Sequence, residues 1–372
     1  MPVLHILIPI HDFSAGGTEV IAFRLAEQWL AAGCRVTILA GAADGAMRGR
    51  VPAGAEVTIL HPPVQRSTFS RLRLGPAMVP ALRRIAPDVV FIPGNFHFIL
   101  AQAFRRALPA TPIVAKISNP MLPDTLSGAV LRSMGAGLLR RYFRPIDMVV
   151  AMNRGLEAEH RRMDPFGQVR TITDPNVPDD AEVMPMRDRR VGTGPVRLLL
   201  IGRLEPQKDI PLALAVVDRL QKRRPAHLTV LGEGYLRATV ERERDRLGLA
   251  GAVALPGFIP DIAAALDAAD VLLITSRYEG GPAVAVEALA RGLPVVSTDC
   301  SHFLRELIVD PRLGRLVAGR DPAALANAIE AQMETEPAPL DLIRATVDPS
   351  RYGAAARAYL ALFNELTGNR SA

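Results

Sequence analysis

Two glutamates in a glycine-containing stretch have the residue type and spacing of a binding site. Glu279 directly precedes Gly280, Gly281 and Pro282, and seven residues separate it from Glu287. Carboxylates accept paired hydrogen bonds from neighbouring hydroxyl groups, and paired glycines let the backbone approach a bound molecule closely. The stretch indicates a pocket in which the backbone closely approaches a bound molecule. Two solvated glutamates in an ordinary α/β unit are the alternative.

The segments around these glutamates predict a strand, loop, helix and strand in succession. Residues 271–275 form an apolar run typical of a strand buried on both faces, and a second such run covers residues 294–298. Between them a helix should begin at Ala283 and end before Gly292. Because ligands bind at the carboxyl ends of strands in open parallel sheets, both glutamates should line one pocket.

Two cations follow another apolar run, residues 196–201. Gly202 allows a close approach of the backbone, while Arg203 and Lys208 place two positive charges at the predicted strand end. Such a pair can clamp a diphosphate. Two surface cations after a strand are common, however, and the pattern gains weight only from its register with the later glutamates.

Together, the segments EGGPAVAVEALARGLPVVSTD and GRLEPQKD closely resemble the motifs of retaining glycosyltransferases of family 4. The resemblance implies an α/β fold of the GT-B type, with two Rossmann-like α/β/α domains facing a central cleft. It places Glu279 beside the donor sugar and Glu287 on the ribose hydroxyls. It places the loop of Gly280, Gly281 and Pro282 against the sugar and phosphates, with the glycine amides as donors. It also implies that Arg203 and Lys208 neutralise the departing diphosphate.

Further motifs of the second half resemble the same nucleotide-sugar site. Gly232 and Glu233 belong to a Gly-Glu-Gly turn that the resemblance places near the nucleotide, and backbone groups at Phe258 and Ile259 should hold the base. Ordinary packing is the alternative for those two side chains. Arg237 occupies the position of the last glycine in a dinucleotide fingerprint, which argues against hydride transfer.

In the first half, candidate contacts follow predicted strands. Gly16 and Gly17 lead into a helix, where amides can face an anion, and they resemble the Gly-Gly-x-Glu loop of the family. His97 follows a strand and is a candidate for the acceptor side. Many family members place a histidine where Ser118 and Asn119 stand here, and asparagine cannot serve as a base. Either the sugar contact is remodelled around Asn119 or His97 substitutes, and the sequence leaves both open.

The chain predicts two domains joined by a polar, proline-bearing connection. An acceptor-side domain should cover residues 1–177, a linker residues 178–195, and a nucleotide-sugar-binding domain residues 196–350. A terminal helix, within residues 351–372, is expected to brace the first domain by resemblance to GT-B proteins. Residues 67–85 should be helical, with interruptions at Gly75, Pro76 and Pro80.

Charge and cysteine content narrow the possible partners and location. The net charge of +6 lies in the first half, and residues 64–144 hold 12 basic residues against two acidic ones. This segment, including the amphipathic stretch 126–143, could meet an anionic membrane surface or could be a solvated face. It lacks nucleic-acid motifs, so nucleic acid is not expected as a partner. Two cysteines and no leader or spanning segment predict a cytoplasmic protein, peripheral at most to the inner membrane face.

These observations predict a glycosyltransferase that moves a sugar from a nucleotide-diphosphate sugar to a glycan or lipid-linked acceptor. The expected process is polysaccharide or glycolipid synthesis. The chain has no Asp-x-Asp pair, and Arg203 with Lys208 can replace a divalent cation, so no metal and no cofactor are expected. The alternatives are a GT-B epimerase or phosphorylase and a non-catalytic nucleotide-sugar binder. The donor's base and sugar, the acceptor and the oligomeric state cannot be read from the sequence.

Overall fold

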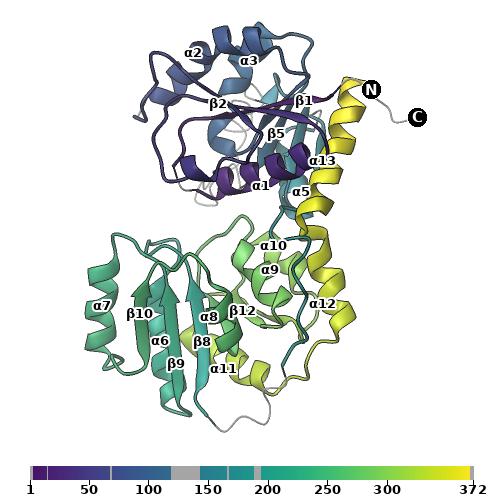
Figure 1. The fold of residues 1–372 in the computed structure, drawn as a ribbon. Coiled ribbons are helices and arrows are strands. Elements are labelled where there is room, and N and C mark those ends of the chain that lie inside the picture. Colours follow the sequence, from purple (N-terminus) through teal and green to yellow (C-terminus); the bar gives the residue numbers. More distant parts are fainter. Residues whose placement is uncertain are drawn as a thin grey trace. The chain divides into compact units, whose positions relative to one another are not determined.

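The computed structural model describes residues 3–14, 16–67, 69–118, 143–165, 167–187 and 194–368. The chain divides into two compact units. The N-terminal unit comprises residues 1–179 together with residues 350–372, and the C-terminal unit comprises residues 180–349. Each unit contains one parallel sheet with helices on both faces (Figure 1).

The sheet of the N-terminal unit has seven parallel strands in the order β3-β2-β1-β4-β5-β6-β7. They are β1 (His5–Ile10), β2 (Arg35–Ala40), β3 (Glu56–Ile59), β4 (Val89–Ile92), β5 (Ile113–Ile117), β6 (Met148–Ala151) and β7 (Val169–Thr171). Successive residues of β1 enter different apolar clusters, because Ile6 and Ile8 face one side of the sheet and Leu7 the other. A strand buried on both faces needs such a continuous apolar run.

Helices cover both faces of this sheet. One face carries α1 (Gly17–Ala31) and α13 (Tyr352–Thr367), and the other carries α2 (Ser70–Ile85), α3 (Leu100–Ala107) and α5 (Arg154–Met163). Two short 3₁₀ segments, η1 (Arg48–Arg50) and η2 (Asn95–His97), lie in loops of this unit, and η3 (Asp348–Ser350) precedes α13. The last helix of the chain therefore belongs to the N-terminal unit.

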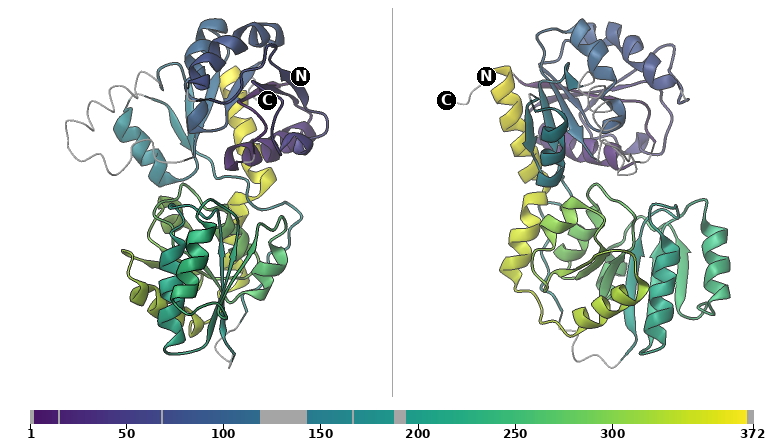
Figure 2. Two further views of the ribbon diagram at one scale, coloured as in Figure 1. Left: turned by 90° about the vertical axis from the view of Figure 1, so that its left-hand side faces the viewer. Right: turned by 180° about the vertical axis from the view of Figure 1, so that it is seen from behind.

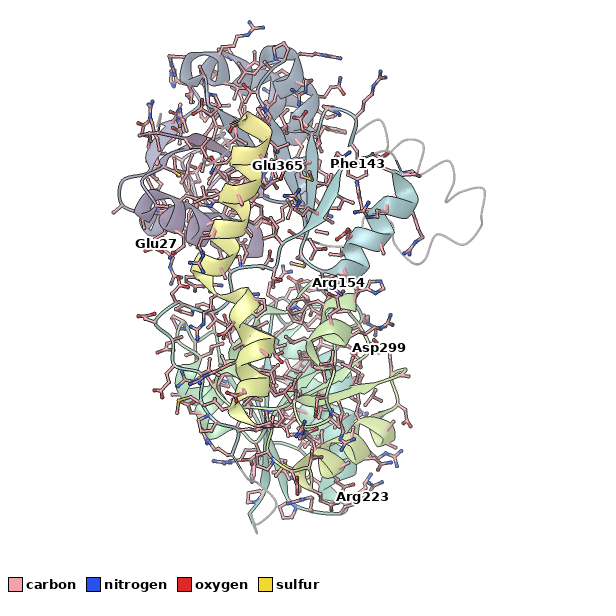
Figure 3. All side chains as sticks on the ribbon, turned by 90° about the vertical axis from the view of Figure 1, so that its right-hand side faces the viewer. Glu27, Phe143, Arg154, Arg223, Asp299 and Glu365 are labelled. Atoms are coloured by element: carbon pink, nitrogen blue, oxygen red, sulfur yellow. The ribbon has the colours of Figure 1, made fainter. Side chains whose placement is uncertain are left out.

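Aromatic side chains join α13 to the core. The ring of Trp29 on α1 lies 5.9 Å from that of Tyr359 and 5.2 Å from that of Phe363, and Phe91 of β4 completes the group. All four side chains are buried. Figure 2 shows α13 beside α1, and Glu365, labelled in Figure 3, pairs with Arg170 of β7 at 2.9 Å. The helix completes this core rather than resting on its surface.

Helix α2 runs without a break through Pro76 and Pro80. The interruptions predicted from these prolines are therefore wrong. A proline removes the hydrogen bond to the carbonyl four residues earlier, here those of Leu72 and Pro76. Leu72, Pro76 and Pro80 are all exposed, so water can satisfy both carbonyls.

Two distant segments pair where the chain leaves and re-enters the N-terminal unit. The amides of Asn176 and Val177 donate to the carbonyl of Ser350, at 2.8 and 3.0 Å, and the amide of Tyr352 donates to Val177 at 2.9 Å. The Asp179 carboxylate also accepts from the amide of Gly353. These contacts fix the start of α13.

The C-terminal unit has six parallel strands in the order β10-β9-β8-β11-β12-β13. They are β8 (Val196–Ile201), β9 (Ala226–Leu231), β10 (Val253–Gly257), β11 (Val271–Ile274), β12 (Val295–Thr298) and β13 (Gly314–Val317). The helices are α6 (Ile210–Gln221), α7 (Arg237–Arg246), α8 (Ala263–Ala268), α9 (Ala283–Ala290), α10 (His302–Leu307), α11 (Pro322–Met333) and α12 (Leu340–Val347). The strand order reverses between β8 and β11, and loops at such a switch point form ligand sites.

Candidate functional site

An ion pair joins the two loops at the switch point of the C-terminal unit. Nζ of Lys208, in the loop after β8, lies 2.5 Å from Oε1 of Glu279, in the loop after β11. The two side chains are only 18% and 9% exposed. Ser276 Oγ donates to the same carboxylate oxygen at 2.6 Å. The arrangement presents an ammonium and a carboxylate side by side, which suits a ligand with both phosphate and hydroxyl groups.

A small pocket contains this pair. Its walls include Lys208, Glu279, Ser276 and Pro282, together with the ends of β8 and β11. Oε2 of Glu279 accepts a long contact, 3.5 Å, from Gln207 Nε2. That oxygen can accept a hydrogen bond from a ligand hydroxyl.

Glycines let the backbone come together beneath Lys208. A Cβ on Gly202 would lie 2.8 Å from Cε of Lys208, so only glycine leaves room for that side chain as it stands. Gly232, with a φ of 144°, packs so closely that a Cβ would lie 2.0 Å from the carbonyl oxygen of Gly202. The predicted nucleotide-side glycines thus fix the strand ends, through packing that the sequence did not reveal.

The loop after Glu279 is held by the neighbouring strand. The amide of Glu279 donates to the carbonyl of Cys300 at 2.9 Å, and Ser301 Oγ donates to the carbonyl of Gly280 at 3.1 Å. Gly281 is half-buried, and Pro282 precedes α9. The loop therefore has one defined path into the helix.

Glu287 lies on α9, near its middle, and is half-buried. The helix begins at Ala283, as predicted. Glu287 is not among the residues that line the small pocket. Glu287 thus lies about one turn after the start of α9, and its ribose contact stays a prediction.

The remaining predicted donor-site residues lie at the same strand edge but are more exposed. Arg203 is 69% exposed and pairs with Glu205 at 3.0 Å, an interaction weak enough to exchange for a ligand. Glu233 is half-exposed and pairs with Arg237 at 2.6 Å. Phe258 and Ile259, 71% and 37% exposed, follow β10.

In the N-terminal unit, the predicted residues gather where β1 and β4 end. Gly16 precedes α1 in an extended conformation, and Gly17 is the first residue of that helix. Thr18 packs on Gly94, where a Cβ would lie 2.9 Å from the threonine side chain. His97 lies buried in η2 in the segment that Gly94 begins. The two predicted loops are therefore neighbours.

Charged groups surround His97. Burial, followed by the charges of His11, Arg66 and Arg71, lowers the pKa of His97 to about 4. Its Nδ1 is buried, with no hydrogen-bond partner in the described part of the chain. Burial opposes ionisation of Asp12, yet hydrogen bonds from Arg66, at 2.7 and 2.8 Å, hold the pKa of Asp12 well below its ordinary value.

The position of Asn119 lies outside the described residues, as does most of the basic stretch 126–143. Its neighbour Ser118 is described: the Ser118 amide donates to Oδ1 of Asn95 at 2.7 Å. Lys116, which the sequence did not single out, is 1% exposed and pairs with Asp174 at 3.0 Å and with Ser118 Oγ at 3.0 Å. The feature that distinguishes this lysine is its burial, which the structure shows and the sequence does not.

Sequence reasoning also missed Ser276, whose hydroxyl donates to the Glu279 carboxylate, and the pair of Arg320 with Asp209, two residues 111 positions apart in the chain. Within the described ranges, no cluster of three His, Cys, Asp or Glu side chains could hold a metal ion. The same ranges contain no helix long and apolar enough to cross a bilayer.

Two family models match consecutive parts of the chain. Residues 16–176 match the glycosyl transferase 4-like domain, and residues 186–347 match the glycosyl transferases group 1. A glycogen synthase of Mycobacterium tuberculosis is 33% identical over 158 residues, 42% of this chain and 38% of that protein. The colanic acid biosynthesis glycosyltransferase WcaL of Escherichia coli, a name given there as putative, is 32% identical over 153 residues, 38% of this chain and 37% of its own. The aligned region thus spans well under half of these relatives.

Solved structures share the whole fold. Sucrose-phosphate synthase from Thermosynechococcus elongatus has a TM-score of 0.74 at 18% identity, covering 99% of this chain and 100% of its own. HepE from Anabaena, in complex with UDP-glucose, has a TM-score of 0.69 at 18% identity, covering 98% of both chains. The predicted GT-B fold, with two Rossmann-like parallel sheets, is confirmed. With two family models matching in succession, the chain belongs to the group 1 glycosyltransferases.

Proposed function

We propose that this glycosyltransferase moves a sugar from a nucleotide-diphosphate sugar to a glycan or lipid-linked acceptor, with retention at the anomeric carbon and without a metal. The observation that carries the proposal is the Lys208–Glu279 pair at the switch point of the C-terminal unit. It offers a cation for a diphosphate and a carboxylate for sugar hydroxyls within one pocket.

The roles divide between charge neutralisation and orientation. Arg203 and Lys208 neutralise the diphosphate as the bond to the sugar breaks, while Glu279 holds the sugar and Glu287 the ribose. The departing phosphate oxygen takes the proton of the acceptor hydroxyl on the same face of the sugar. The bond to the acceptor oxygen forms on that face, so the configuration is retained.

The names of similar proteins support the wider setting. WcaL is described as a colanic acid biosynthesis glycosyltransferase, and a structural neighbour, WaaB, as a lipopolysaccharide outer core galactosyltransferase. Assembly of a cell-surface polysaccharide or glycolipid is the process we propose for this chain. HepE binds UDP-glucose, so a UDP-sugar is the first donor to test.

A panel of UDP-, GDP-, ADP- and CDP-sugars tests the donor class. One nucleotide should raise the melting temperature in thermal-shift screening, and the matching sugar nucleotide should then glycosylate a component of a cell lipid or glycan extract in excess chelator. Proton NMR of the product gives the anomeric configuration. Inversion or a strict metal requirement would contradict the mechanism, and nucleotide release without transfer would favour an epimerase. Binding without any turnover would indicate a non-catalytic binder.

The outer face of α2 supports a peripheral membrane contact. Phe69 and Leu72 are 70% and 59% exposed. Helical spacing places Arg73, Arg83 and Arg84 on the same side, and all three are exposed. Apolar side chains flanked by arginines suit an anionic lipid surface. These side chains lie within the predicted basic region, residues 64–144.

Vesicle flotation tests this contact. The chain should float with vesicles containing one third phosphatidylglycerol, and Arg83→Glu/Arg84→Glu should abolish flotation. Arg223→Glu/Arg224→Glu, the same charge change on the C-terminal unit, should leave it intact. Equal flotation of both double variants would exclude α2 as the contact.

A further inference from the structure

Arg320 crosses two strands to reach the candidate site. It lies in the loop after β13, the edge strand, beyond β12 and β11 in the sheet order. Its Nη2 donates to the carbonyl of Thr275 at 3.1 Å, and its Nη1 donates to the carbonyl of Ser276 at 3.2 Å. Nη2 also pairs with the carboxylate of Asp209. One guanidinium thus joins the end of β11 to the start of α6.

Asp209 has an unusual backbone for its residue type. Its φ of 45° and ψ of 57° lie in the left-handed region, which non-glycine residues seldom adopt. Its side chain makes no capping hydrogen bond to α6 and is 10% exposed. The carboxylate instead lies between Arg320 and Arg277, whose Nη2 is 3.0 Å away. The strained position is therefore stabilised by two cations.

The residues that Arg320 holds are those that hold Lys208 and Glu279. Thr275 Oγ1 donates to the carbonyl of Lys208 at 2.8 Å. Ser276 Oγ donates to the Glu279 carboxylate at 2.6 Å. Asp209 is the next residue after Lys208. The positions of Lys208 and Glu279 therefore both depend on backbone segments that Arg320 contacts.

We propose that Asp209 and Arg320 are positioning residues for sugar transfer, which fix the Lys208 ammonium against the Glu279 carboxylate. The inference rests on the proposed function and adds two residues that touch neither ligand nor reacting atoms. We call the contacts of Arg320 with Asp209, Thr275 and Ser276 the Arg320 bracket. A displacement of about 1 Å in a reacting group can cost roughly 100-fold in rate. Loss of the bracket should therefore lower turnover more than donor affinity.

Kinetics of matched variants test the bracket. Arg320→Ala and Asp209→Gly should each lower kcat about tenfold or more, with the donor KM changed less than about threefold. Glycine adopts the left-handed conformation freely, so Asp209→Gly removes the carboxylate without backbone strain. Arg320→Lys should fall between, and guanidinium ion should partly restore Arg320→Ala. Arg312→Ala, which removes an arginine paired locally with Asp310, should match the wild type.

Lysine labelling gives a second readout that needs no turnover. The chain has three lysines: Lys116 is 1% exposed, Lys208 is paired with Glu279, and Lys222 on the far end of α6 is 62% exposed. After brief acylation, peptide mass spectrometry should show the ratio of Lys208 to Lys222 labelling rising at least about threefold in Arg320→Ala, since a loosened pair reacts faster. Arg312→Ala should leave the ratio unchanged.

The two readouts separate the possible failures. A wild-type chain that turns over no donor would overturn the proposed function. An unchanged labelling ratio in both Arg320→Ala and Asp209→Gly would overturn the bracket, whatever the wild type does. A changed ratio with wild-type kcat would show that the bracket holds Lys208 but does not serve transfer, and would also overturn the proposal.

Discussion

The ammonium of Lys208 and the carboxylate of Glu279 form one ion pair at 2.5 Å. The sequence assigned these residues to different parts of a donor, Lys208 to the diphosphate and Glu279 to the sugar. Their contact means that the group expected to bind the phosphate and the group expected to bind the sugar form one ion pair. A change in either residue therefore alters the surroundings of the other, and single substitutions at the pair should not be additive.

Loss of either donor-site cation should impair turnover. Lys208→Ala and Arg203→Ala should each lower kcat by roughly 10²–10³, equivalent to about 3–4 kcal/mol of transition-state stabilisation. Steady-state kinetics with saturating donor measures the effect. Lys222→Ala removes a lysine from the surface of α6 and serves as the control. A Lys208→Ala variant with the control's kcat would remove this lysine from the mechanism.

Glu287 should matter for binding more than for turnover. Glu287→Ala should weaken nucleotide binding about tenfold, because a carboxylate that holds two ribose hydroxyls contributes in ground and transition states alike. Isothermal titration of the nucleoside diphosphate measures the change. Glu334→Ala, at the exposed end of α11, is the matched control. Wild-type affinity in Glu287→Ala would show that the ribose assignment is wrong.

His97 should make the N-terminal unit less stable in acid. Its pKa is lowered from 6.5 to about 4, first by burial and then by His11, Arg66 and Arg71, with Asp12 opposing. Between these pH values the unfolded chain binds the proton and the folded chain does not, so stability falls as the pH drops below about 6.5. His97→Gln should remove up to about 3 kcal/mol of this loss between pH 7 and pH 4.

Tryptophan fluorescence can measure the loss of stability of the N-terminal unit, which contains His97. Trp29 is the chain's single tryptophan and is buried in the N-terminal unit. Denaturant unfolding followed at Trp29 should give a flatter pH dependence for His97→Gln than for the wild type. His61→Gln, at an exposed position, should keep the wild-type slope. Parallel curves for all three proteins would refute the prediction.

The buried pair Lys116–Asp174 should be costly to break and cheap to replace. Burial raises the pKa of Asp174 even with Lys116 beside it. Lys116→Met removes the paired ammonium from that buried carboxyl and should destabilise the N-terminal unit by about 3–5 kcal/mol. Lys116→Met/Asp174→Leu should recover most of the loss. Unfolding followed at Trp29 decides, and a double variant no better than Lys116→Met would contradict the explanation.

Much of the fold could be predicted from short-range patterns. The apolar runs at residues 196–201, 271–275 and 294–298 correspond to β8, β11 and β12, and β8 has the predicted bounds. Short helices such as α8 and α10 were not predicted, because six residues carry too little periodicity. The prolines of α2 misled because a sequence does not tell which side of a helix faces water.

The site could be predicted only in outline. Motif order brought Arg203, Lys208 and Glu279 to neighbouring strand ends, since parallel strands meet at one edge. The direct pairing of Lys208 with Glu279, and the reach of Arg320 across two strands, depend on packing between distant segments. Asn119 lies outside the described residues. Whether Asn119 or His97 takes the role of the family's histidine therefore stays open.

The place of α13 in the N-terminal core sets an order of events during synthesis. Phe91 and Trp29 need Tyr359 and Phe363 to complete their cluster. At ribosomal speeds, Tyr359 is made roughly 10–50 s after Phe91. The C-terminal unit is complete in the meantime. The unit that begins the chain must therefore finish folding last, and its half-formed aromatic core is where a chaperone would be needed.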